Sequence, residues 1–209
     1  MSGGSAPRSA TLAWVALTAT LGAGLVGAIR QRREARRIRA GALPRAGAAA
    51  VILPSSPEGA LARRLATWTP AAPTSALGRV AAMAWASPLT AVGLALGATT
   101  GGRARWDDEH GCLVIEGARA GSARLLRVVG AGANAMGHVV VSTYGRTPPV
   151  VLAHEAGHVR QAERLGPLLF PVYVWSAARY GYRDNPIERG ARLAARRWLD
   201  AGSVSAPRP

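Results

Sequence analysis

The five residues from His154 to His158 have the types and the spacing that a hydrolytic metal centre needs. They read His-Glu-Ala-Gly-His, and on a helix the first and last of these positions lie on one face. Both imidazoles can therefore reach a single metal ion, which we expect to be Zn²⁺. Glu155 lies about 100° around the helix from His154, where its carboxylate can accept a proton from a metal-bound water molecule. The motif predicts metal-activated hydrolysis with Glu155 as the general base.

The flanking residues favour a helix around this motif. Thr147-Pro148-Pro149 is a suitable helix start, because proline lacks the N–H that the first turn leaves unpaired, and Gly166-Pro167 is a typical helix end. Gly157 costs about 1 kcal/mol relative to alanine in a helix interior. Its presence makes sense if another stretch of backbone passes close by. Gln161 lies on the same stripe as His154, and we interpret it as a solvated polar residue.

A catalytic zinc site usually has a third protein ligand, and Glu188 is the expected one. In Asn185-Pro186-Ile187-Glu188, Asn185 resembles an N-cap, so the carboxylate would lie in the first turn of a second helix. Two other roles remain open for Glu188: a capping box with Asn185, or an ion pair with Arg192 one turn later. If Glu188 is not a ligand, Asp184 and, more weakly, His138 are the candidates.

Together these residues resemble a known class of enzymes. His-Glu-x-x-His followed by a glutamate on a later helix is similar to the gluzincin metallopeptidases. More closely, residues 154–161 (His-Glu-Ala-Gly-His-Val-Arg-Gln) and 182–189 (Tyr-Arg-Asp-Asn-Pro-Ile-Glu-Arg) resemble paired motifs in a family of uncharacterised bacterial membrane-associated proteins. The resemblance covers roughly residues 76–198 and implies His154, His158 and Glu188 as ligands and Glu155 as general base. It implies no substrate, and Gly190 stands where a bulkier residue is expected.

The composition bounds the possible partners. The 209 residues carry a formal net charge of +15, and all 26 basic residues are arginines. A basic chain suggests nucleic acid, but the sequence has no recognised nucleic-acid module and its aromatic residues do not alternate with the arginines. No nucleic-acid partner is therefore expected, although an arginine-driven binder of anionic lipid or nucleic acid remains an alternative function. The single cysteine, Cys112, excludes an intrachain disulfide and is expected to be buried.

Two uncharged stretches have the length of membrane helices. Thr11 to Ile29 is followed by an arginine-rich run, residues 30–39. Residues 1–29 are therefore predicted to be a retained transmembrane anchor, with residue 30 onward in the cytoplasm. Residues 80–100, interrupted by Pro88, are expected to form a second membrane helix. If that helix spans, the metal domain is extracytoplasmic; if it lies within one leaflet, the domain is cytoplasmic. Either arrangement predicts the bacterial cell membrane as the location and its lipids as partners.

The rest of the chain divides into a linker and a compact domain. Residues 30–79 are basic and rich in Pro, Ala and Gly, which is typical of a flexible linker, with one short helix near 57–68. Residues 101–201 are the expected metal domain, and residues 202–209 a disordered tail. Within the domain the residue types predict three strands and two helices after the motif helix. The strands are 112–116, 125–129 and 137–144, and the helices are 168–180 and 186–199.

The expected fold is thus α+β: a small antiparallel sheet with a zincin-like helix pair, preceded by one or two transmembrane helices. The edge of the 137–144 strand could hold an extended peptide by strand addition. The expected function is that of a membrane-anchored zinc-dependent metallopeptidase with an unidentified peptide or protein substrate. His138 and Tyr182 are candidates for stabilising the oxyanion. The alternative is a non-catalytic membrane protein with a structural zinc ion.

Overall fold

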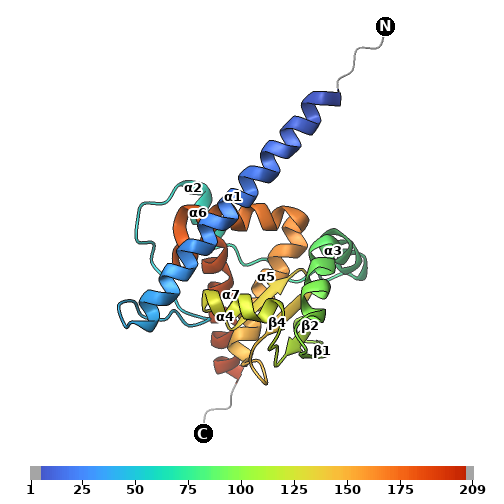
Figure 1. Ribbon diagram of the computed structural model, residues 1–209. Coiled ribbons are helices and arrows are strands. Elements are labelled where there is room, and N and C mark those ends of the chain that lie inside the picture. Colours follow the sequence, from blue (N-terminus) through green and yellow to red (C-terminus); the bar gives the residue numbers. More distant parts are fainter. Residues whose placement is uncertain (1–5, 206–209) are drawn as a thin grey trace.

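The computed structural model describes the backbone of residues 6–205 and the side chains of residues 18–202. Helices cover one four-stranded sheet (Figure 1), so the predicted α+β class is confirmed. In chain order the elements are α1 (Ala6–Arg39), α2 (Ala60–Ala66), α3 (Ala76–Ala98), β1 (Arg103–Asp107), β2 (Cys112–Glu116), α4 (Ser122–Val129), β3 (Ala133–Met136), β4 (Val139–Ser142), α5 (Pro149–Leu165), the 3₁₀ turn η1 (Gly166–Leu168), α6 (Leu169–Asp184) and α7 (Pro186–Ser205).

The sheet has the order β1-β2-β4-β3 and is mixed, not antiparallel as predicted. The hairpins β1–β2 and β3–β4 are antiparallel, but β2 and β4 run parallel, with Leu113 opposite Val139. The reason is the connection between the hairpins, which carries α4 and returns the chain in the same direction beside β2. Side chains alternate between the faces. Val114 and Val140 pack against α5, whereas Ile115 packs with α4.

The stretch from Leu125 to Val129, predicted as a strand, lies in helix α4. Its pattern fits a helix because Ala123 and Leu126, three residues apart, both pack against the sheet, while Leu125 is exposed. Gly130 ends the helix with φ +77°, a left-handed conformation that favours glycine. A short apolar run of this length does not distinguish a strand from a helix by periodicity.

Helix α3 lies against the sheet through small residues. A Cβ atom on Gly93 would come within 2.5 Å of the Met136 carbonyl oxygen, and one on Gly97 within 2.2 Å of Ile115 Cδ1. The outer face remains apolar and exposed, for example at Val80 and Val92. Among the described residues, α3 is the one helix that is long and apolar enough to cross a membrane.

Helix α1 continues without a break through the predicted anchor boundary at residue 29 and the arginine run to Arg39. The side chains of residues 1–17, which make up much of the predicted anchor, lie outside the described part of the chain. The second half of α1 packs on α6. There, a Cβ atom on Gly27 would lie 3.1 Å from Ala177 Cβ, and Arg30 donates a hydrogen bond to the Arg179 carbonyl.

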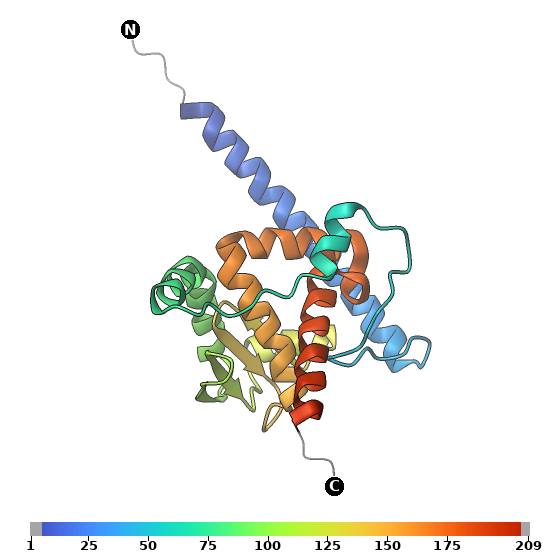
Figure 2. The same cartoon turned by 180° about the vertical axis from the view of Figure 1, so that it is seen from behind.

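The segment between α1 and α3 crosses the back of the molecule and contacts α5, α6 and α7 (Figure 2). It contains α2, within the short helix predicted near residues 57–68. Glu58 forms an ion pair with Arg189 of α7, and the Ala71 carbonyl accepts a hydrogen bond from Arg164 of α5 at 3.3 Å. The predicted linker is therefore held to the metal domain by specific contacts.

Candidate metal centre

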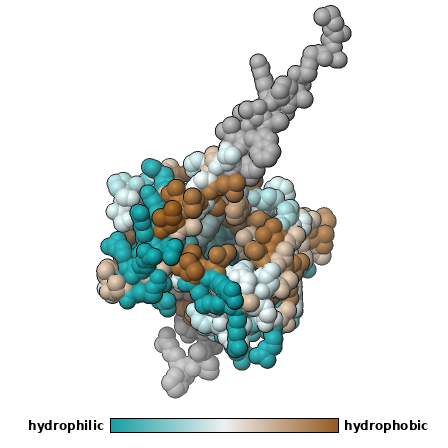
Figure 3. Space-filling model, in the orientation of Figure 1, coloured by the Kyte–Doolittle hydropathy of each residue, from teal (hydrophilic) through white to brown (hydrophobic). Residues whose placement is uncertain are grey.

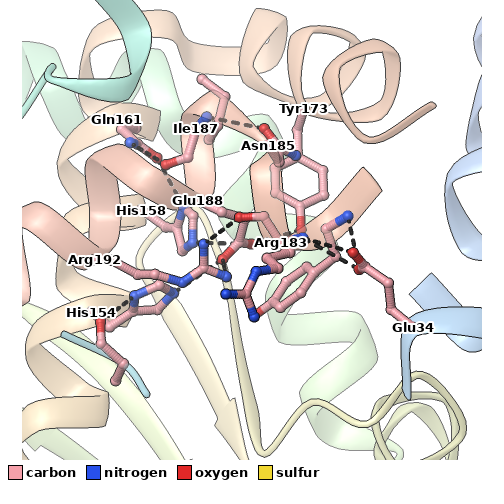
Figure 4. A network of polar contacts seen from close by, with 12 residues as sticks. Glu34, His154, His158, Gln161, Tyr173, Arg183, Asn185, Ile187, Glu188 and Arg192 are labelled. Atoms are coloured by element: carbon pink, nitrogen blue, oxygen red, sulfur yellow. Dashed lines mark hydrogen bonds and ion pairs between the residues drawn. The ribbon is translucent and has the colours of Figure 1, made fainter. Parts of the chain in front are cut away.

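Two motif helices bring three side chains together, as the sequence predicted (Figure 4). His154 and His158 come from α5 and Glu188 from α7. The Nε2 atom of His154 lies 3.3 Å from Oε2 of Glu188, and Nε2 of His158 lies 3.5 Å from Oε1. One ligand atom from each residue falls within 4.8 Å of the others, and all three side chains are buried. This group could hold a metal ion.

Gly157 permits the close approach of the two helices. A Cβ atom on Gly157 would lie 3.0 Å from Cα and 3.3 Å from Cβ of Ala191 on α7. The nearby backbone that this glycine suggested is therefore α7 itself. Because Glu188 lies one turn before Ala191, the same approach brings its carboxylate to the imidazoles.

Hydrogen bonds orient both imidazoles. Nδ1 of His154 lies 3.1 Å from the Ala48 carbonyl oxygen, and Nδ1 of His158 lies 2.8 Å from Oε1 of Gln161. The amide nitrogen of Gln161 donates to the Ile187 carbonyl, so its oxygen faces His158 as an acceptor. Each Nδ1 therefore carries a proton, and each Nε2 points at the Glu188 carboxylate. Such outer contacts fix the tautomer of metal-binding histidines.

The interpretation of Gln161 as a solvated residue is wrong. Its side chain is completely buried, and both ends of its amide are hydrogen-bonded within the centre. Its position at i+3 from His158 was visible in the sequence, but a polar residue on a helix stripe is more often solvated. The burial comes from α7, which lies over this face of α5.

The Glu188 carboxylate has one satisfied and one unsatisfied oxygen. Oε1 accepts a hydrogen bond from the Tyr173 hydroxyl at 2.7 Å, whereas buried Oε2 has no hydrogen-bond partner. Arg192 forms an ion pair with Oε2 at 3.7 Å, so the ion pair that the sequence left open is present in addition to the approach of the imidazoles. Two imidazole nitrogens and a carboxylate oxygen that converge in a buried space are a donor set that Zn²⁺ accepts. The residues therefore fit the expected metal.

The charges of the group reinforce one another. Burial raises the pKa of Glu188, but the imidazoles of His158 and His154 lower it more, and the net pKa is well below the ordinary value. Burial lowers the pKa of His158, and the carboxylate of Glu188 raises it more, to about 9. Without a metal, His158 is thus protonated opposite a charged carboxylate. A bound cation would replace that proton.

The contacts of Glu188, Asp184 and His138 show which of these candidates for the third ligand lies beside the two imidazoles. Asn185 caps α7, because its Oδ1 accepts the N–H of Ile187 at 3.0 Å, but Glu188 turns to the imidazoles instead of completing a capping box. Asp184 accepts hydrogen bonds from Ser55, and His138 lies between Thr90 and Glu163, 3.1 Å from the latter. Neither Asp184 nor His138 belongs to the group.

Glu155 lies beside the group and faces β3. Its carboxylate is buried and accepts a hydrogen bond from the backbone N–H of Ala135, and burial raises its pKa. Together with His154, it lines two cavities, of about 420 Å³ and about 250 Å³. Both cavities therefore meet the group at the predicted general base.

The strand edge beside the group belongs to β3. The prediction that strand 137–144 forms this edge is wrong, because β4 lies between β2 and β3. Thr143 N–H donates to the Gly132 carbonyl, so alternation along the antiparallel pair turns the N–H and C=O groups of Ala133 and Ala135 away from β4. This segment, Ala-Asn-Ala-Met, was missed because it lacks β-branched residues.

Two further residues near the centre were not foreseen. Gly190 is required because a Cβ atom there would lie 2.8 Å from the Trp68 carbonyl oxygen and 2.9 Å from that of Leu65. Glu34, a lone acid in an arginine run, accepts hydrogen bonds from the N–H groups of Tyr182 and Arg183. The single acidic residue in the run 30–39 is the feature of the sequence that could have predicted this role.

Comparison with models of protein families, with curated proteins and with solved structures finds no match for this chain. The functional assignment therefore depends on the geometry of the site.

Proposed function

We propose that this protein is a membrane-associated, zinc-dependent peptidase whose centre is formed by His154, His158 and Glu188. The observation that carries the proposal is the convergence of two imidazole Nε2 atoms on the buried carboxylate of Glu188, whose Oε2 accepts no hydrogen bond, next to Glu155 at the wall of two cavities. A purely structural zinc site is usually closed by a fourth protein ligand. Among the described side chains the group contains three ligands, which favours catalysis.

The residues of the chain divide the chemistry between them. A zinc ion at this centre would lower the pKa of a water molecule and polarise a peptide carbonyl. Glu155 would accept the proton of that water and return it to the leaving amine; its raised pKa makes its carboxylate a stronger base. The backbone groups of Ala133, which point away from β4, would hold the substrate as an added strand.

Tyr182 is the better of the two candidates for stabilising the oxyanion. It lines both cavities, and burial raises its pKa, so its hydroxyl remains a donor. His138, the other candidate, is hydrogen-bonded to Glu163 away from the group. Membrane association is supported by the exposed apolar face of α3.

The first test is the zinc content of the full-length protein purified in detergent. We expect one zinc per chain in the wild type and loss of zinc in His158→Ala and Glu188→Ala. Asp184→Asn is the matched control, because Asp184 neighbours α7 but bonds to Ser55 instead of entering the group. Wild-type protein without zinc after reconstitution would refute the centre.

The second test separates catalysis from a structural role. Glu155→Gln should keep its zinc and lose hydrolysis of a library of quenched fluorescent peptides. Hydrolysis retained in Glu155→Gln would refute the mechanism. If zinc raises the unfolding temperature of the wild type and the wild type hydrolyses none of the peptides, the metal is structural. Activity controlled by salt but insensitive to chelator would indicate an arginine-driven binder.

A further inference from the structure

Two cavities meet at the candidate centre, and the smaller is apolar. Its volume is about 250 Å³. Beside the side chains of the centre, its walls come from α3, α4, β3 and α6. Its apolar members include Leu89, Leu126, Val129, Met136, Phe170 and Val174. In Figure 3, hydrophobic side chains gather around a hollow on the face that α1 crosses.

The larger cavity, of about 420 Å³, is lined by arginines from α1, the segment after it, α4, α6 and α7. These are Arg39, Arg45, Arg127, Arg183 and Arg192. The acidic residues in its wall are Glu34 and Glu155, and Glu34 already accepts two backbone N–H groups. The cavity therefore has an excess of positive charge, and its occupant is expected to be anionic.

The two cavities adjoin beneath α1. Gln31 of α1, His154, Glu155 and Tyr182 line both of them. Helix α1 closes over the junction where Ala35 meets the turn after α4; a Cβ atom on Gly130 would lie 3.0 Å from Ala35 Cβ. An extended chain that lies across these shared walls would contact the centre and reach both cavities.

Strand β3 gives such a chain a direction. Ala133 at its start lines both cavities, whereas Met136 at its end lines only the apolar one. A peptide that pairs antiparallel with β3, the slightly more stable arrangement, begins beside Met136 and ends beside Ala133. Its amino-terminal part then lies in the apolar cavity, and its carboxyl-terminal part enters the arginine cavity.

We infer that the substrate is an extended peptide in which an apolar stretch is followed, toward the carboxyl terminus, by acidic residues, and that it is cleaved near their junction. This inference rests on the proposed function, since it assigns the substrate of the same centre. Binding can nevertheless be measured without hydrolysis, which allows the two to fail separately.

The test uses zinc-loaded, full-length Glu155→Gln protein in detergent and three fluorescein-labelled peptides. One joins Leu-Val-Ala-Leu-Val-Ala to Glu-Asp-Glu-Asp, the second has the two halves in reverse order, and the third replaces the acidic half by Lys-Arg-Lys-Arg. Fluorescence anisotropy should show at least about tenfold tighter binding of the first peptide than of the other two, because one desolvated charge reversal is worth that factor or more. Added salt should weaken this preference.

Variants of the cavity walls test which half of the peptide lies in which cavity. Phe170→Arg should weaken binding of the first peptide, and the double change Arg39→Glu with Arg45→Glu should shift the preference to the basic peptide. Arg64→Glu is the matched control, because Arg64 is an exposed arginine of α2 that lines neither cavity. Equal binding of all three peptides, binding of none, or tighter binding of the reversed peptide would overturn the inference. Loss of zinc, or hydrolysis by Glu155→Gln, would instead overturn the proposed function.

Discussion

The Nδ1 atom of His158 lies 2.8 Å from Oε1 of the buried Gln161, and the same glutamine donates to the Ile187 carbonyl at the start of α7. One side chain thus fixes the tautomer of an imidazole and joins the helix of the histidines to the helix of the glutamate. Four consequences of this arrangement and its surroundings can be measured.

Replacing Gln161 should weaken the centre without removing a ligand. In Gln161→Leu the Nδ1–H of His158 loses its acceptor, and we expect zinc affinity to fall about 10- to 100-fold, the usual effect of losing an outer-shell partner. Competition with a chromophoric chelator would measure it. Gln31→Leu is the control. It removes the same kind of side chain from the wall of both cavities, but the hydrogen bonds that orient the imidazoles come from Ala48 and Gln161. Unchanged affinity in Gln161→Leu would contradict the orienting role.

Zinc affinity should rise with pH. In the metal-free protein, the carboxylate of Glu188 outweighs burial and raises the pKa of His158 from 6.5 to about 9. Because the folded pKa is raised, the stability from this pair is fully present below about pH 6.5 and is lost as pH rises through 9. Zinc must displace that proton, so affinity should increase by up to about tenfold per pH unit over this range. Titrations at several pH values would test it, and a flat profile would refute it.

Gly190→Ala should destabilise the protein, although alanine is the better helix former. Its Cβ atom would meet the carbonyl oxygens of Trp68 and Leu65, and we expect a cost of about 1–3 kcal/mol, as for overpacking. Gly202→Ala, on the same helix with nothing within 4 Å, should instead stabilise by up to about 1 kcal/mol. Urea unfolding of both variants measures the difference. Equal effects would show that α2 and its following turn do not hold α7.

Glu34→Ala should loosen α1 from α6. The change leaves the N–H groups of Tyr182 and Arg183 without their acceptor, beside Gly181 with φ +77°, and each buried unsatisfied group costs about 1–3 kcal/mol. Limited trypsin digestion should then cut the arginine run 30–39 faster. Glu34→Gln, which keeps an acceptor oxygen, is the control and should resist longer. Identical digestion of both variants would show that the hydrogen bonds from Tyr182 and Arg183 to Glu34 do not hold α1 on α6.

The sequence was informative where the determinants are local. The spacing of His154 and His158, and the N-cap at Asn185 that places Glu188 in the first turn of α7, predicted that these side chains would meet. The burial of Cys112 was predicted correctly, and burial raises its pKa to about 12.

The remaining features depend on distant parts of the chain. The partner of His154 is the carbonyl oxygen of Ala48, an atom that every residue has, so no residue type marks it. Gln161 is buried only because α7 lies over it. The parallel pairing of β2 and β4 depends on the course of the connection between two hairpins, which short strand patterns do not encode.

The hydrogen bond between Arg164 and the Ala71 carbonyl has a consequence for how the protein sits on a bilayer. Ala71 precedes α3 and Arg164 follows it, yet they touch. A helix that crosses the hydrocarbon core separates its flanks by about 30 Å, whereas the five residues from Ala71 to Ala76 extend at most about 18 Å. We therefore expect α3 to lie along a lipid surface in monotopic fashion rather than to cross it. The segment before α3 and the predicted metal domain after it would then face the same aqueous phase.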